Sequence, residues 1–404
     1  MKNFFVNLFV KLLTERLFSV TILSVETGKD IKNLQKQTDV KKKPQKSMGE
    51  GIFCLFMVLF AIFEVILLTV ILVRCFDTGE PSVEPPQNEE TTPDEEITTQ
   101  PPVSLPVFSG GVLPPMPTAN ANTKLISGIQ SQYAVLVNAK TGEIIAGQNA
   151  FSRFSPASMT KVMTLIVACE RLTQDELDKT LTMTQEVYDY ARADGYADST
   201  LYGIDVGDEY SICDLLYGIG MESASDCVLP IVFYLAESEA DFVAWMNQKA
   251  VALGLKDTKF DNAIGHDSEN NYTTAADMAM IMSYAMQNDL IMDILGKEVH
   301  RSTAAGYNSS GTFVPSFPFS FYSSLFGEHT SSRMYAYKAQ YGKDFRLDTA
   351  TLTAGKTGWT TDNYCLVCSG VDGEKTPYIL VLAKAAKKYE TMLDVKTIFD
   401  TYVK

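Results

Sequence analysis

Residues 155–161, with the sequence SPASMTK, run directly into the apolar stretch VMTLIVA at residues 162–168. The apolar stretch is typical of a helix, and on that helix Ser158 and Lys161 would lie on one face because residues three apart are neighbours. A desolvated lysine amine can take the proton from an adjacent hydroxyl, and a helix N-terminus favours the negative charge that develops. The stretch therefore predicts a nucleophile at Ser158 with Lys161 as its base. Taken alone, the same spacing would also suit an exposed helix start.

A second polar motif follows much later in the chain, at Gly355-Lys-Thr-Gly358, and it leads through Trp359 into a strand-like run from Asn363 to Val371. Lys356 and Thr357 at a strand edge would offer a fixed cation and a hydroxyl to a carboxylate, and Gly358 would let ligand backbone approach closely. That combination suits the C-terminus of a peptide. A plain polar turn that opens a strand is the alternative.

A third motif, Met221-Glu-Ser-Ala-Ser-Asp226, lies between two helical runs. Ser223 in this motif could face the Ser158–Lys161 pair and relay a proton to a leaving amine. By itself the motif would pass for a helix N-cap.

Hydrophobic periodicity around these motifs predicts one mixed domain. Strand-like runs occupy residues 133–138, 143–146, 363–371 and 377–385, and helical stretches occupy residues 158–172, 211–220, 226–236, 238–253, 274–287 and 389–403. Strands at both ends with helices between them imply a sheet that joins distant parts of the chain.

The N-terminal third is organised differently. Residues 51–73 are almost wholly apolar and are long enough to cross a bilayer, with Glu64 as the one charge. Lysines 41–43 and Lys46 precede the run and acidic residues follow it, which predicts a cytoplasmic N-terminus. We therefore expect a cytoplasmic segment (1–47), a transmembrane helix (48–76), a linker rich in Pro, Glu and Thr (77–122) and an extracellular domain (123–404). A cleaved signal peptide or a lipoprotein signal fits the run less well, and Met48 is a possible alternative start.

Composition excludes several classes of function. A net charge of -15 among 404 residues gives no basic surface for nucleic acid. Seven cysteines make no disulfide framework, and we expect buried free thiols, with Cys365 and Cys368 pointing to opposite faces of a strand. The three histidines lie outside the motifs, which disfavours a metal site, and no cofactor motif is present. The same scatter and the absence of a Gly-x-Ser-x-Gly elbow disfavour a Ser-His-Asp hydrolase.

The order Ser-x-x-Lys, Ser-x-x, Lys-Thr-Gly is the signature of serine enzymes that react with penicillin. The chain resembles the low-molecular-mass penicillin-binding proteins, the D-alanyl-D-alanine carboxypeptidases. The resemblance extends from the hairpin at Tyr133 to Ile145, through Asp241 to Lys249, to Tyr272 to Asp277, and it covers roughly residues 123 to 404.

The resemblance implies a β-lactamase/transpeptidase-like fold, in which helices flank an antiparallel sheet beside an all-helical subdomain. It implies that Ser158 attacks the bond between two terminal D-alanines of a peptidoglycan stem pentapeptide, with β-lactams as covalent inhibitors. The roles it implies are catalysis by Ser158, Lys161 and Ser223, and substrate binding by Ser225, Lys356, Thr357, Gly358 and Trp359. The backbone N–H groups of Ser158 and Trp359 would form the oxyanion hole.

Three departures from the family pattern bear on activity. Ser225 stands where the family usually has Asn, and a hydroxyl cannot make both hydrogen bonds of an amide, so Ser225→Asn is expected to raise activity. Gly265-His266 replaces His-Gly, and residues 301–350 form a longer, aromatic-rich stretch before Lys356. Two other functions therefore stay open: a degenerate module that senses peptidoglycan or β-lactams, and a β-lactamase, for which no placed carboxylate is evident.

Overall fold

The computed structural model describes residues 106–193, 196, 199–302, 306–307, 313–314, 319–327, 331–361 and 363–404. The segments predicted as cytoplasmic (1–47), as a transmembrane helix (48–76) and as a linker (77–122, up to residue 105) lie outside these ranges. Within them, no helix combines the length and the apolar character that crossing a membrane requires.

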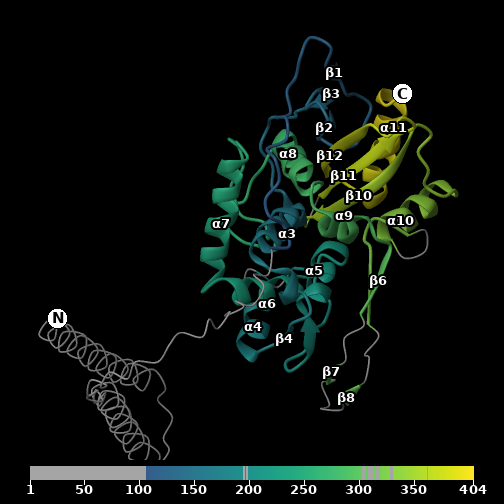
Figure 1. The fold of residues 1–404 in the computed structure, drawn as a ribbon. Coiled ribbons are helices and arrows are strands. Elements are labelled where there is room, and N and C mark those ends of the chain that lie inside the picture. The colour runs from purple at the N-terminus through teal and green to yellow at the C-terminus, as the bar shows by residue number, and fades with distance from the viewer. Residues whose placement is uncertain are drawn as a thin grey trace, which may run out of the picture. The chain divides into compact units, whose positions relative to one another are not determined.

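A six-stranded sheet forms the centre of the domain (Figure 1), in the order β1-β3-β2-β12-β11-β10. Its strands are β1 (Lys124–Leu125), β2 (Tyr133–Asn138), β3 (Ile144–Gln148), β10 (Ala350–Trp359), β11 (Tyr364–Asp372) and β12 (Pro377–Ala385). All neighbours pair antiparallel except the two-residue β1, which runs parallel to β3. The β2–β12 pairing joins the two ends of the domain and confirms the predicted sheet that connects distant parts of the chain.

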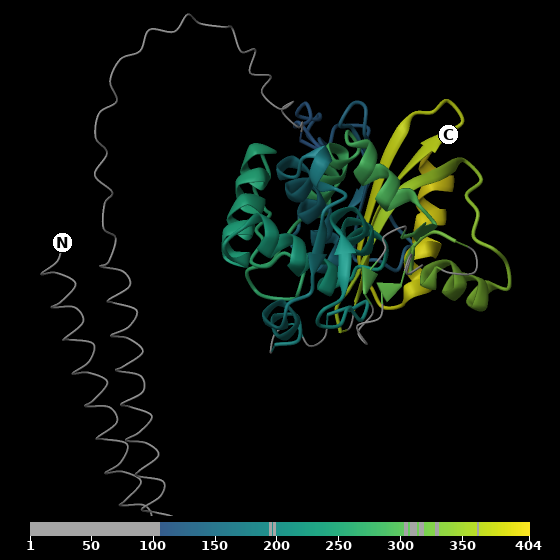
Figure 2. The same cartoon turned by 60° about the horizontal axis from the view of Figure 1, so that its bottom comes forward.

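The two faces of the sheet bury two separate cores, because successive side chains of a strand point to opposite sides. On β2, Val135 and Val137 pack into the larger core with the helices, whereas Ala134 and Leu136 pack into the smaller core under α11 (Lys388–Tyr402). Figure 2 shows α11 on one side of the sheet and the helical body on the other. Cys365 lies in the larger core and Cys368 in the smaller one, so the expected opposite orientation of these thiols is observed.

The helical body lies between β3 and β10 in the sequence. It contains the 3-10 helix η1 (Ala157–Thr160) and helices α3 (Lys161–Arg171), α4 (Gln185–Tyr190), α5 (Ile212–Met221), α6 (Ser225–Leu235), α7 (Glu239–Ala252), α8 (Ala275–Ala285), α9 (Asp289–Gly296) and α10 (Ser332–Tyr341). A second 3-10 turn, η2, spans Gln174–Glu176, and short strand pairs join β4 (Thr180–Thr182) to β5 (Glu209–Ser211), β6 (Val299–Arg301) to β9 (Ser320–Tyr322), and β7 (Gly306–Tyr307) to β8 (Phe313–Val314). The helix predicted at 158–172 consists of η1 followed by α3, and the other predicted helices begin and end within two residues of their expected bounds.

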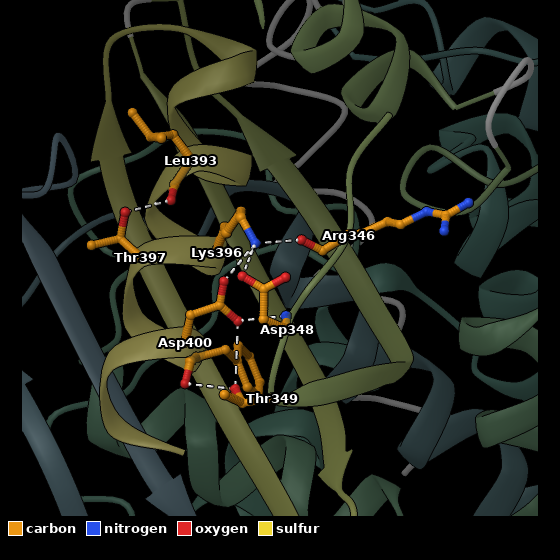
Figure 3. A network of polar contacts seen from close by, with 8 residues as sticks. Arg346, Asp348, Thr349, Leu393, Lys396, Thr397 and Asp400 are labelled. Atoms are coloured by element: carbon orange, nitrogen blue, oxygen red, sulfur yellow. Dashed lines mark hydrogen bonds and ion pairs between the residues drawn. The ribbon is translucent and has the colours of Figure 1, made fainter. Parts of the chain in front are cut away.

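Hydrogen bonds and ion pairs join helix α11 to the segment that precedes β10. Lys396 donates to the carbonyl of Arg346 at 2.8 Å and pairs with Asp348 at 3.0 Å and Asp400 at 2.6 Å. The backbone N–H of Asp348 also donates to Asp400 at 2.7 Å (Figure 3). These contacts fix where β10 begins, and β10 carries the Lys-Thr-Gly motif at its far end.

The last part of the segment expected as linker, residues 106–122, packs against the domain. The backbone N–H groups of Val107 and Phe108 donate to the carbonyls of Leu172 and Cys169, at 2.7 and 2.8 Å. Both side chains are buried, and the Phe108 ring contacts Tyr284. The domain's packing therefore extends back to residue 107.

Candidate active site

Ser158 and Lys161 meet at the junction between η1 and α3. Ser158 lies in η1, and Lys161 is the first residue of α3, whose next eight residues are all buried. Burial of that apolar stretch draws the start of the helix into the core, and Lys161 is only 1% exposed. Its Nζ lies 3.2 Å from Ser158 Oγ, within hydrogen-bond distance. The spacing of the two residues thus gives a direct contact between amine and hydroxyl.

The environment of Lys161 favours its neutral form. Burial lowers the pKa of this amine from 10.5 to about 7, against the opposing negative charge of Asp226. The Nζ atom also donates to the carbonyl of Ile264 at 2.5 Å. An amine that is partly unprotonated near neutral pH and touches a serine hydroxyl is suited to act as a general base.

A second buried lysine lies beside this pair. Lys356 is fully buried in β10, and its Nζ donates to Ser223 Oγ at 2.8 Å and to the carbonyl of Thr357 at 3.0 Å. Burial, followed by the charges of Lys161 and Arg333, lowers the pKa of Lys356 well below its ordinary value. The sequence predicted a fixed cation at Lys356, and the structure places this amine in a buried position that disfavours its charged form.

Two glycines allow three segments to converge on the turn before Ser158. A Cβ on Gly358 would lie 3.2 Å from the Cβ of Ala157 and 3.3 Å from the N atom of Met159, so β10 approaches η1 closely because it has no side chain there. A Cβ on Gly265 would lie 2.0 Å from the carbonyl oxygen of Ala157, and Gly265 has a φ of +79°. The motifs at 158–161 and 356–358 and the loop at 265 therefore form one site.

Backbone strain is concentrated at the same place. Ala157, directly before Ser158, has a φ of 48°, and Ser223 has a φ of 64°. Residues with a side chain rarely adopt the left-handed region, and such residues persist where the surrounding structure fixes them, often at functional sites. The strain at Ala157 and Ser223 is independent support for a functional site.

A cavity of about 320 Å³ opens over Ser158 and Lys161. Its wall also includes Ser199, Thr200, Ile264, Gly265, His266, Asp267, Trp359, Thr360 and Thr361. Trp359 is 47% exposed at this wall, whereas Ser223, Lys356 and Thr357 lie more deeply, each less than 9% exposed. The arrangement suits a ligand that enters along the end of β10 and reaches Ser158.

The structure brings most of the predicted site residues together but gives Ser225 a different position. The Ser225 side chain is fully buried at the start of α6, and its Oγ has no hydrogen-bond partner within the described ranges. Its backbone N–H donates to the carbonyl of Thr200 at 2.8 Å. Ser225 thus offers its backbone to the loop that lines the cavity and no side-chain surface to a substrate.

Several residues at the site carried no clear signal in the sequence. Ile264 contributes a carbonyl, which any residue has, and Ser324 from the unassigned stretch 301–350 contacts Thr357, with 2.7 Å between the two hydroxyl oxygens. His266 lies outside the three motifs, yet it lines the cavity. The pair Gly265-His266 was noted as a departure from the family pattern, and that was the available signal.

A family model described as D-alanyl-D-alanine carboxypeptidase (peptidase family S11) matches residues 118–313. The D-alanyl-D-alanine carboxypeptidase DacF of Bacillus subtilis is 31% identical over 41% of this chain and 42% of its own length, and DacC of Escherichia coli is 30% identical over 41% and 42%. These alignments therefore span less than half the length of the two relatives. A D-alanyl-D-alanine carboxypeptidase of a Streptomyces species is 28% identical over 69% of this chain and 89% of its own.

Solved structures show the same fold. A Streptomyces DD-transpeptidase variant superposes with a TM-score of 0.56 at 23% identity and covers 68% of this chain and 98% of its own. A D-alanyl-D-alanine carboxypeptidase from Mycobacterium tuberculosis superposes with a TM-score of 0.54 at 21% identity, covering 70% and 94%. At this level of identity the likeness establishes the mixed α/β DD-peptidase fold.

Proposed function

Because the chain belongs to the D-alanyl-D-alanine carboxypeptidase family, we propose that it removes the terminal D-alanine from peptidoglycan stem peptides through an acyl-enzyme on Ser158. The observation that carries this proposal is the buried amine of Lys161, with a pKa of about 7, at 3.2 Å from Ser158 Oγ. A serine with such a base at hand is an activated nucleophile.

The chemistry proceeds in two stages. Lys161 takes the proton as Ser158 Oγ attacks the carbonyl between the two D-alanines, and the backbone N–H groups of Ser158 and Trp359 stabilise the oxyanion. Ser223 gives its hydroxyl proton to the leaving amine and takes the proton from Lys161 in return, so the C–N bond breaks, D-alanine departs and Lys161 is neutral again. Water then attacks the ester carbonyl, and its proton returns to Ser158.

The terminal carboxylate of the substrate would be held by the lysine and hydroxyl of β10. Lys356 lies in a buried position next to Ser223, and Thr357 lies beside it. An anion that enters this dry site restores the charge of Lys356, and a charge-assisted hydrogen bond is stronger there than in water. β-Lactams carry a carboxylate next to the reactive amide, so they fit the same subsite as covalent inhibitors.

Covalent labelling combined with turnover tests this proposal. We expect the ectodomain, residues 106–404, to release D-alanine from a pentapeptide that ends in two D-alanines and to be labelled by a fluorescent penicillin. Ser158→Ala should abolish both while keeping the melting temperature. Labelling without turnover would favour the sensor, fast turnover of penicillin itself would favour the β-lactamase, and a folded protein that shows neither labelling nor turnover would refute acyl transfer.

For the cellular location we propose a single-pass membrane protein with a cytoplasmic N-terminus and an extracellular catalytic domain. The apolar run 51–73 and the lysines that precede it support this orientation. Protease added to intact cells should degrade the domain and spare an epitope placed before residue 47. Protection of the domain from that protease would contradict the orientation.

A further inference from the structure

The carbonyl of Ile264 holds the catalytic amine from outside the three motifs. Lys161 Nζ donates to it at 2.5 Å. In the neutral amine, an N–H directed at this carbonyl leaves the lone pair free to accept the Ser158 proton. Thr164, one turn along α3, donates through Oγ1 to the carbonyl of Ala263 at 2.6 Å. Residues 263 and 264 therefore set the orientation of Lys161, and the reaction depends on what holds them.

The loop that contains Ile264 is fixed by two polar side chains. Asn262 accepts through Oδ1 from the backbone N–H groups of Gly265 and His266, at 2.7 and 2.8 Å. The N–H of Ala263 instead donates to Oε1 of Glu239, in the first turn of α7, at 2.8 Å. Asn262 shapes the loop from within, whereas Glu239 attaches it to the helical body.

Glu239 is only 6% exposed, and both of its carboxylate oxygens are used. Oε2 accepts from the hydroxyls of Tyr190 at 2.8 Å and Tyr196 at 2.5 Å. The carboxylate lies in the first turn of α7, where a helix favours negative charge. A buried carboxylate is costly unless it is paired in this way.

Through Tyr196, the same carboxylate reaches the other wall of the cavity. The Tyr196 ring stacks on His266, with ring centroids 6.1 Å apart. The backbone carbonyl of Tyr196 accepts from the N–H of Ser199 at 2.8 Å. His266 and Ser199 both line the cavity above Ser158. Glu239 thus connects two walls of the site without touching the cavity itself.

We infer that Glu239 is a positioning residue for acyl transfer: it anchors the 263–266 loop so that the Ile264 carbonyl orients Lys161 toward Ser158. The inference rests on the proposed function. The anchor depends on a side-chain oxygen that is long enough to accept from the Ala263 N–H, and it does not depend on the charge of Glu239. The charged and titratable groups that face Lys161 are Asp226 and Cys227 on α6 and Lys356 on β10.

Two variants separate reach from charge. Glu239→Asp keeps the charge but withdraws the acceptor by one methylene, and Glu239→Gln keeps the reach without the charge. With penicillin as the probe, the acylation rate constant and the noncovalent dissociation constant are measured separately. We expect Glu239→Asp to slow acylation by about 10- to 100-fold, the usual result of misplacing a catalytic group by about 1 Å, with the dissociation constant nearly unchanged. Glu239→Gln should remain within about threefold of the wild-type acylation rate, because its carbonyl oxygen can still accept from Ala263.

Asp394 on α11 provides a matched control. This carboxylate is 1% exposed and accepts from the N–H groups of Gln130 and Ser131, at 2.9 and 2.7 Å, so it is also a buried anchor, but it does not line the cavity. Asp394→Glu should lower the melting temperature and leave acylation unchanged. Wild-type acylation in Glu239→Asp, or equal slowing in Glu239→Asp and Glu239→Gln, would overturn the inference.

Amide hydrogen exchange tests the anchor independently of activity. We expect the amides of Ala263 and Gly265 to exchange faster in Glu239→Asp than in the wild type and in Asp394→Glu. Unchanged exchange would overturn the inference even if the wild type is labelled by penicillin. Conversely, a wild type that is not labelled refutes the proposed function, while the exchange experiment still decides whether Glu239 anchors the loop.

Discussion

The pH dependence of acylation tests the assignment of Lys161 as the base. Only the neutral amine can accept the Ser158 proton, so the acylation rate follows the neutral fraction of Lys161. With a pKa of about 7, that fraction rises from about one tenth near pH 6 to about nine tenths near pH 8. The second-order rate constant should therefore increase about tenfold over this range and then level off.

The assay is fluorescent-penicillin labelling of the ectodomain under pseudo-first-order conditions, with penicillin far below saturation. The rate constant then reports the ionisation of the free enzyme. Melting temperatures recorded in the same buffers exclude partial unfolding as the cause of a change in rate. A rate that keeps rising toward the ordinary lysine pKa of 10.5 would refute the reasoning, because Lys161 would then not be desolvated.

Removing a charge next to Lys161 should shift the midpoint of the pH profile in a direction that can be predicted. Asp226 is fully buried, and its negative charge raises the pKa of Lys161. Its oxygens accept from the N–H groups of Tyr202, Gly203 and Ile204 at 2.8 to 3.0 Å. Asp226→Asn removes the charge that favours the ammonium, so the midpoint of the pH profile should move to lower pH. A midpoint that moves to higher pH would show that another group controls the profile.

Three further substitutions test the packing around the site. Gly265→Ala should destabilise the protein by about 2–4 kcal/mol in chemical denaturation, because its Cβ would lie 2.0 Å from a carbonyl oxygen. The control Gly128→Ala is also at positive φ but has nothing within 4 Å, so it should cost only about 1 kcal/mol of backbone strain. Equal losses of stability in the two variants would contradict the close approach at Gly265. Ser324→Ala removes the hydroxyl that hydrogen-bonds to Thr357 at 2.7 Å, and a loss of about 1 kcal/mol would weaken peptide binding about fivefold in KM at constant kcat; an unchanged KM would remove Ser324 from carboxylate binding. Ser225→Asn, expected from the sequence to raise activity, must fit an amide into a fully buried position, so we expect a stability loss of about 1–3 kcal/mol, and faster acylation at unchanged stability would favour the sequence-based expectation.

Regular elements with strong hydrophobic patterns were predictable. The strand expected at 377–385 is β12 (Pro377–Ala385), and the helix expected at 211–220 is α5 (Ile212–Met221). These segments bury apolar side chains over most of their length, so periodicity determines them. The contact between Ser158 and Lys161 was predictable for a similar reason, since it depends only on local helical spacing.

Strand β10 was harder to predict because its sequence is polar and rich in glycine. It spans Ala350–Trp359, so Lys356 lies inside a strand rather than in a turn that opens one. Its glycines serve close approach to other segments: a Cβ on Gly355 would lie 2.4 Å from Leu325. Glycine is required at such positions because segments from elsewhere in the chain pack against them, and the pattern within one segment does not reveal those contacts.

The contacts that position the Lys161 amine could not be predicted from the sequence for a related physical reason. Ile264 contributes its backbone carbonyl, and the Glu239 carboxylate accepts from the backbone N–H of Ala263, so neither contact requires a particular side chain at loop positions 263 and 264. Glu239 also follows Ser238, which caps α7, and from the sequence it looks like an ordinary acidic residue in a first turn. Only the fold shows that this carboxylate faces inward.

The protonation states of the two buried lysines of the site, Lys161 and Lys356, depend on each other. Lys356 and Lys161 are close enough for the charge of Lys161 to lower the pKa of Lys356, so charging both amines is disfavoured. A ligand carboxylate next to Lys356 makes its charged form favourable, and a charged Lys356 in turn favours the neutral form of Lys161, which is the form that accepts the Ser158 proton. In the proposed mechanism, binding of a carboxylate at β10 and activation of Ser158 would therefore be coupled electrostatically. This coupling gives a physical reason why peptides with a free C-terminus, and β-lactams that carry a carboxylate, suit this pair of lysines.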